Sequence, residues 1–166
     1  MAQAEFKQKL QQIDPEKIVF VDETGFDEWF HQNHAYSKIG VPVVGKIYGR
    51  KFARTNFVSG LLNGKIVGGY FYRENTKAAM FENWVAHYLL SDIPFGCTII
   101  LDNATFHRKK KLEELAQQKN CKILFLPPYS PELNAIEKSW ANVKRYLRTN
   151  SFANLVDAIC GYFKIE

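Results

Sequence analysis

The sequence predicts an α/β fold with a five-stranded mixed sheet and helices on both faces. Two apolar segments are joined by Asn63-Gly64, which is the strongest short signal for a β-hairpin. After this hairpin, helical and strand patterns alternate, as is typical of parallel strands connected through helices. A chain of 166 residues is long enough for one such domain, and we expect a single domain over 1–166.

The first half of the chain contains the hairpin and the first buried strand. A helix over 2–12, with a linker role for 1–14, precedes a β-branched strand over 17–22. This strand is expected to stop at Glu23-Thr24-Gly25. Residues 26–50 contain several glycines and form an extended basic insertion. The hairpin strands are 52–62 and 65–72.

The second half alternates helices with strands. Thr76 is expected to cap a helix over 76–90, and Ser130, in a proline-rich turn, to cap another over about 131–148. Strands are expected at 97–102 and 122–126, and further helices at 108–119 and 152–163. The inner faces of the two capped helices are predicted to contain Met80, Phe81, Trp84 and Tyr88, and Leu133, Ile136, Trp140, Val143 and Leu147, respectively.

The positive charge is concentrated in one stretch. The net charge is +5, yet no acidic residue lies between Trp29 and Arg73. One explanation of such a stretch is that it forms solvated loops. The other is that it forms a surface that binds nucleic-acid phosphates or another polyanion. The seven cations there are Lys38, Lys46, Arg50, Lys51, Arg54, Lys65 and Arg73.

Other classes of protein are excluded by what the sequence lacks. No apolar run approaches the roughly 20 residues that span a bilayer, and no signal segment opens the chain. The three cysteines are isolated, which argues against a disulfide framework and a structural zinc site. We therefore expect a reducing, cytoplasmic location without a membrane partner.

Two buried strands each end in an aspartate. Ile18, Phe20 and Asp22 share one face of the first, and Asp102 shares a face with Thr98 and Ile100 in the other. If the strands are parallel neighbours, the two carboxylates lie side by side at the carboxyl edge of the sheet. The alternative is that each aspartate simply begins a turn.

Glu137 is a third candidate, because it adjoins the apolar stripe of its helix. Three segments then resemble the mariner-like superfamily of DDE transposases, most closely its bacterial insertion-sequence branch. They are VDETGF, LDNATFH and LPPYSPELNAIEKSWANVKRYLR, and 34 residues separate Asp102 from Glu137. The resemblance spans about residues 17–150 and implies a ribonuclease H-like fold with the catalytic triad Asp22, Asp102 and Glu137.

The implied chemistry is metal-dependent phosphoryl transfer. Carboxylate oxygens without nearby sulfur or imidazole suit Mg²⁺ or Mn²⁺, and we expect two ions held by the triad. Such a site hydrolyses DNA at transposon ends, and the freed 3′-hydroxyl then attacks target DNA. Asn103 and Asn134 are candidates for orienting the carboxylates. The expected DNA contacts are Lys38, Lys46, Arg50, Lys51, Arg54, Arg108 and Lys109.

The family's amino-terminal helix-turn-helix region has no counterpart here, since only about sixteen residues precede the first strand. The chain is then a catalytic fragment, or the DNA-binding half is encoded separately. The resemblance further implies a homodimer that binds transposon ends and target DNA in the bacterial nucleoid.

The remaining polar and aromatic candidates have simpler interpretations. Glu23 faces away from Asp22 and is expected to be structural, although it is the best substitute if the strand register differs. His31 and His34 are expected to be surface or phosphate contacts, and His107 to cap a helix, contact DNA or assist catalysis. Trp84 and Trp140 are expected in the core.

Two alternative functions stay open: a stand-alone ribonuclease H-type nuclease, and a non-catalytic DNA-binding module descended from a transposase. A glycosidase would also use paired acids, but that function would not explain the basic segment. For the transposase we expect at least one carboxylate with a raised pKa in the metal-free protein. Asp102→Asn is then expected to leave the metal-free fold intact or more stable.

Overall fold

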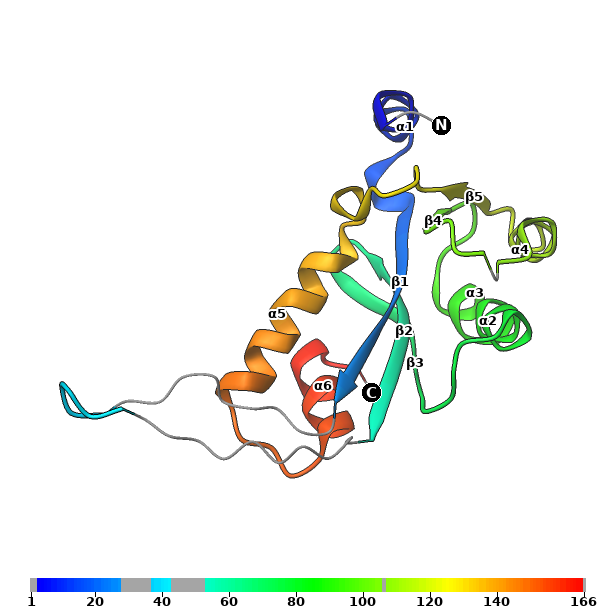
Figure 1. Ribbon diagram of the computed structural model, residues 1–166. Helices are drawn as coiled ribbons and strands as arrows, with labels where there is room; N and C mark the ends of the chain where they lie inside the picture. The colour runs from blue at the N-terminus through cyan, green and yellow to red at the C-terminus, as the bar shows by residue number, and fades with distance from the viewer. Residues whose placement is uncertain (1–2, 28–36, 43–52, 106, 166) are drawn as a thin grey trace.

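The computed structural model describes residues 3–27, 37–42, 53–105 and 107–165, and its centre is a five-stranded sheet (Figure 1). The strand order is β3-β2-β1-β4-β5. Strand β1 is antiparallel to β2 and parallel to β4, so the predicted mixed sheet and its central parallel pair are confirmed. The strands are β1 (Ile18–Asp27), β2 (Arg54–Leu62), β3 (Lys65–Tyr72), β4 (Thr98–Leu101) and β5 (Lys122–Phe125).

Helices cover both faces of this sheet. Figure 1 shows α5 and α6 on one side, and α2, α3 and α4 on the other. The helices are α1 (Gln3–Gln11), α2 (Ala78–Trp84), α3 (Leu90–Asp92), α4 (Lys109–Gln117), α5 (Ile136–Thr149) and α6 (Leu155–Phe163). Short turns are η1 (Pro15–Lys17), the π-helical η2 (Val85–Leu89) and η3 (Pro131–Leu133).

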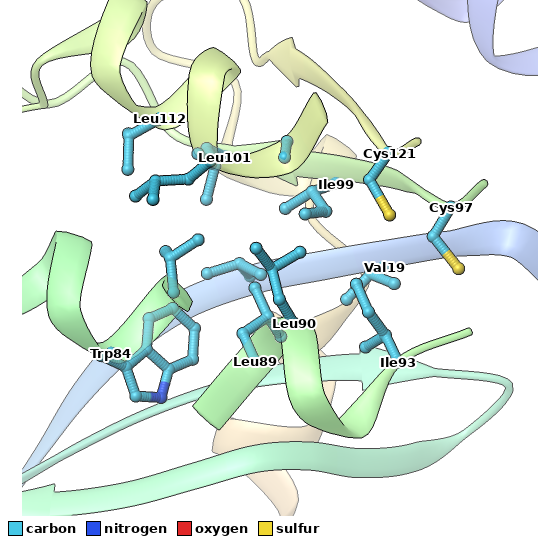
Figure 2. Packing of buried hydrophobic residues seen from close by; sticks show 14 of the residues in the cluster. Val19, Trp84, Leu89, Leu90, Ile93, Cys97, Ile99, Leu101, Leu112 and Cys121 are labelled. Carbon is cyan, nitrogen blue, oxygen red and sulfur yellow. The ribbon is translucent and has the colours of Figure 1, made fainter. Parts of the chain in front are cut away.

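The two faces of β1 belong to different cores. Val19 and Val21 pack with α2, η2 and α4, together with Ile99 and Leu101 of β4 (Figure 2). The opposite face packs against α5 and α6 through Phe20 and Phe26. Alternation along β1 therefore places Asp22 on the same face as Phe20, which is the α5 side.

Strand β1 is longer than the sequence predicts. Glu23-Thr24-Gly25 does not end it, because the strand stays paired with β2 as far as Asp27, opposite Arg54. Pairing with β4 is much shorter and stops at Phe20, opposite Ile100. The two parallel strands therefore share no ladder beyond Phe20, and the sheet opens at the level of Asp22.

The helix after the hairpin also differs from its prediction. Thr76 does not cap it, because the Thr76 hydroxyl donates to the Glu23 carboxylate (2.6 Å) instead. The π turn η2 shifts the inner face, so Val85 and Leu89 are buried while Tyr88 is exposed. The shift fits the contact with Gly68, whose carbonyl accepts from Trp84 Nε1. Gly68 has a φ of +60°, and a Cβ there would lie 2.9 Å from the Leu89 backbone.

The basic insertion lies mostly outside the described part of the chain. Residues 26 and 27 belong to β1, and within 26–50 the structure otherwise describes only 37–42. His31, His34, Lys46, Arg50 and Lys51 lie outside the described residues. In the part of the chain that is described, no helix is long and apolar enough to cross a membrane.

Candidate active site

Asp22 lies on β1 where the sheet opens, facing the first half of α5. Its carboxylate Oδ2 accepts a hydrogen bond from the indole Nε1 of Trp140 (3.0 Å). Burial is the largest influence on Asp22 and raises its pKa to about 7; repulsion from Glu137 and Asp102 adds to it, whereas hydrogen bonds from the Glu23 backbone and Trp140 oppose it. The expected carboxylate with a raised pKa is therefore Asp22.

Asp102 directly follows β4 and has a different environment. Its Oδ1 lies 2.9 Å from His107 Nε2 and accepts the amide of Ala104 (3.3 Å). The His107 ring is buried, with 3% of its side chain exposed, and packs against Phe81 at 4.4 Å between centroids. The hydrogen bond from His107 holds the pKa of Asp102 below its usual value. This direction argues against the expectation that Asp102→Asn leaves the fold intact or more stable, which stays a prediction for unfolding measurements.

Glu137 completes the set from the first turn of α5. Asp22, Asp102 and Glu137 line one cavity of about 450 Å³. The structure thus places the three predicted carboxylates, which come from three separate elements, around one space. Asn103 and Asn134 line the same cavity, together with the turn at 126–131.

Asn134 precedes α5, and its side chain reaches the β1 backbone. Its Nδ2 donates to the carbonyl of Val21 (3.1 Å), next to Asp22. Its buried Oδ1 has no hydrogen-bond partner among the described residues. Ser130, expected to cap the following helix, instead donates its hydroxyl to the Pro128 carbonyl (3.2 Å), and η3 lies between it and α5.

The cavity suits a hard divalent cation by the chemistry of its donors. It offers carboxylate and amide oxygens, the ligands that Mg²⁺ and Mn²⁺ prefer. Asp22 is charged only against burial and repulsion, which a bound cation would relieve. Among the described residues, however, no three acidic, histidine or cysteine side chains converge as a ready metal site. An ion held by all three carboxylates would therefore require them to lie closer together than they do here.

The structure also places four of the predicted DNA-contact residues. Arg108 forms a two-pronged ion pair with the buried Glu82 (2.6 and 2.5 Å), so it joins α2 to the start of α4. Lys109 lies over the Phe125 ring, 4.7 Å from its centroid. Lys38 and Arg54 are exposed. Glu23 does not line this cavity and accepts from Tyr72 and Thr76, but it lines a smaller cavity of about 150 Å³ together with Asp22 and Asp102.

Sequence reasoning missed several residues around the carboxylates. Trp140 is in the core, as predicted, but also donates to Asp22. Lys144 lies close enough to Glu137 and Asp22 for both to raise its pKa, although burial, the larger influence, lowers it. Residues 137, 140 and 144 share one helical face at spacings of three and four, which was the available signal. Tyr129 lines the cavity from the proline-rich turn.

Comparison with family models identifies the domain. The model described as "DDE superfamily endonuclease" matches residues 17–159. The chain belongs to this family. The match covers β1, β4 with the residue that follows it, and α5, and therefore all three carboxylates of this DDE endonuclease domain.

Solved structures of the Mos1 transposase share the fold of this DDE endonuclease domain. The Mos1 paired-end complex with the left transposon end matches with a TM-score of 0.79 at 15% identity, over 98% of this chain and 52% of that chain. The Mos1 strand transfer complex gives 0.78 at 15% identity, over 98% and 52%. The catalytic domain of Mos1 mariner transposase gives 0.64 at 13% identity, over 98% and 77%. The ribonuclease H-like fold is thereby confirmed.

This DDE endonuclease domain spans about half the length of the Mos1 chains in those complexes. A comparison with curated protein sequences gives no match.

Proposed function

We propose that the chain is the catalytic domain of a DNA transposase that cleaves DNA at transposon ends and joins the freed 3′-hydroxyl to target DNA. The observation that supports this most is the convergence of Asp22, Asp102 and Glu137 on one cavity. Membership of the DDE endonuclease family and the fold shared with Mos1 transposase support it further.

Asp22, Asp102 and Glu137 would hold Mg²⁺ or Mn²⁺, and we propose two ions. Mos1 paired-end complexes have been solved with Mn and with Mg. When bound, such ions activate the attacking oxygen and stabilise the leaving oxygen of the phosphodiester. The other residues of the site act on the carboxylates. Trp140 fixes one oxygen of Asp22, and His107 fixes one oxygen of Asp102.

The proposal is tested by cleavage of supercoiled plasmid DNA. We expect nicking with Mg²⁺ or Mn²⁺ and none with chelator. Glu137→Gln should lower the rate by more than about 100-fold, the upper range for groups that only support metal ligands. Glu132→Gln is the matched control, since Glu132 precedes the same helix and does not line the cavity. Equal rates for the two variants would exclude Glu137 from the site.

The same assay separates this function from its alternatives. A ribonuclease H-type nuclease would prefer an RNA–DNA hybrid and would not join DNA ends. A non-catalytic DNA-binding module would bind plasmid without nicking it. Joining of a labelled oligonucleotide with a free 3′-hydroxyl to plasmid, dependent on Glu137, is the result expected only of a transposase.

We further propose that the cations of the insertion and of the start of β2 contact the DNA phosphates. Changing Arg50, Lys51 and Arg54 together to Ala should weaken DNA binding and flatten the plot of log K against log salt, by up to about one unit for each phosphate that is no longer neutralised. Changing Lys7, Lys77 and Lys122, which are exposed elsewhere, removes the same charge and serves as control. Equal slopes for the two triple variants would show that Arg50, Lys51 and Arg54 are not specific phosphate contacts.

The finer placement of the protein is also a proposal. The spacing of Asp102 and Glu137 and the Pro-Pro-Tyr-Ser-Pro turn favour the bacterial insertion-sequence branch. We propose that the working unit is a homodimer and that a helix-turn-helix region outside the present sequence reads the transposon ends.

A further inference from the structure

Tyr129 is the most unusual side chain at the cavity. The residue is 99% exposed although it carries a large aromatic ring, and it is among the residues that line the carboxylate cavity. Its backbone is left-handed, with φ at +54°. A bulky non-glycine residue rarely adopts this conformation, because its Cβ crowds the backbone. The fold thus maintains a costly backbone conformation while leaving the ring without burial.

The turn that holds Tyr129 is fixed on both sides. Pro127 and Pro128 precede it and Pro131 follows it, so few backbone angles are free. Ser130 is buried, donates to the Pro128 carbonyl, and accepts from Gln3 Nε2 of α1 (3.0 Å). Gln3 also donates to Glu132 (2.9 Å). The ring is therefore presented from a rigid support, and little entropy is lost when a flat partner binds it.

The cavity beside Tyr129 indicates what this partner is. On the proposed function, the carboxylates receive a phosphodiester, so the base attached to that nucleotide lies within a few ångströms of the cavity rim. An exposed aromatic ring binds any unstacked base through its face, without reading its hydrogen-bonding edge. Tyr129 has both the position and the free ring that such a contact needs.

We propose that Tyr129 is a stacking platform for the nucleobase next to the phosphate that is attacked at the carboxylate site. The ring would hold this base out of the DNA stack and so fix the register of the strand in the cavity. The inference rests on the proposed function for the identity of the ligand. Tyr129 itself would contact substrate and take no part in bond making.

The test compares DNA with and without bases. The probes are a fluorescein-labelled single-stranded oligonucleotide about 12 nucleotides long, within the span that single-strand sites cover, and its fully abasic counterpart. Both probes present the same phosphates. The dissociation constant of the abasic probe divided by that of the probe with bases therefore reports contacts to bases. Tyr129→Ala should lower this ratio about tenfold, the order expected for one base stacked on an aromatic ring. Tyr129→Phe should keep the wild-type ratio.

Phe95→Ala is the matched control, because Phe95 is an exposed ring (70%) that does not line the cavity. Its ratio should equal that of wild type.

A wild-type ratio in Tyr129→Ala would overturn the proposal. A change in sedimentation without a change in this ratio would also overturn it, because the ring would then serve contact between copies of the chain. Plasmid nicking by wild type is scored separately. Nicking with no role for Tyr129 refutes only stacking, and a Tyr129-dependent ratio without nicking refutes only the cleavage function.

Discussion

Replacing Asp22 with Asn is expected to raise the free energy of unfolding of the metal-free protein at pH 8 by up to roughly 4 kcal/mol. The pKa of Asp22 is raised from 3.8 to about 7, chiefly by burial. Asn keeps the shape and an oxygen that can accept from Trp140, but it has no charge to bury. The gain is therefore the cost of ionising Asp22 inside the fold.

The sign of this effect depends on pH. Because the pKa is higher in the folded protein than in the unfolded chain, the folded state binds the proton more tightly. Wild-type stability from this group is complete below about pH 4 and is lost as pH rises to about 7. Asp22→Asn removes this part of the slope, so the two proteins should differ little at pH 4 and most above pH 7.

Chemical unfolding at a series of pH values, with chelator present, measures the difference. Asp27→Asn is the matched control, since Asp27 is exposed at the end of the same strand and its substitution should change stability by no more than about 0.5 kcal/mol. Asp102→Asn should be destabilising at pH 8, because its pKa is lowered by His107. If Asp22→Asn were less stable than wild type at pH 8, Asp22 would not have the raised pKa.

Metal should narrow the difference in stability between the two proteins. At a hundred times its dissociation constant, an ion that binds only the native state stabilises it by about 2.7 kcal/mol. Wild type should gain this amount from Mn²⁺ at pH 8, whereas Asp22→Asn should gain little. A full response in the variant would mean that Mn²⁺ binds elsewhere.

Truncating Trp140 is expected to be as large an effect in the opposite direction. Trp140 is 2% exposed and packs edge-on against Phe57 (5.7 Å) and Phe163 (6.0 Å). Trp140→Ala should cost about 3–5 kcal/mol by removing this packing and leaving a cavity. Most of this destabilisation should be independent of pH, since it comes from packing, while the loss of the N–H that donates to Asp22 adds a part that depends on pH.

Trp140→Phe separates the hydrogen bond from the packing. It retains a ring but lacks the N–H that donates to Asp22 Oδ2. That bond favours the charged carboxylate, so its removal should cost up to about 1.4 kcal/mol more at pH 8 than at pH 5, where Asp22 is already protonated. Unfolding at the two pH values gives this difference. An equal cost at both would show that the indole does not stabilise the Asp22 carboxylate.

The sequence allowed the sheet and the triad to be predicted because their signals are local or repeated. Asn63-Gly64 adopts left-handed angles at both positions (φ 50° and 76°), as the hairpin requires. The apolar strands before Asp22 and Asp102 could be recognised from composition, and the parity of each strand fixed which face the acids share. Glu137 needed the family resemblance, since most glutamates on helices are simply solvated.

The errors come from competition between distant partners. Thr76 has the local preference of an N-cap residue, but its hydroxyl donates to Glu23, which is 53 residues away in sequence. Strand β1 passes Gly25 because β2 provides partners there, and Arg54 then covers the glycine, where a Cβ would lie 2.0 Å from its Nε. The opposite pKa shifts of Asp22 and Asp102 depend on Trp140, His107 and burial, which no pattern within either strand contains.

The point where strand pairing ends beside the cavity also determines where the chain can accept an insertion. The loop from Asp102 to the start of α4 leaves the sheet after the last ladder pair of β4, at Leu101 with β5. An insertion in this loop breaks no strand pairing, and doubling its length costs only about 0.6 kcal/mol of chain entropy. The part of the cavity lining that this loop contributes can therefore vary in length without a change in the strand pairing of β1, β4 and β5.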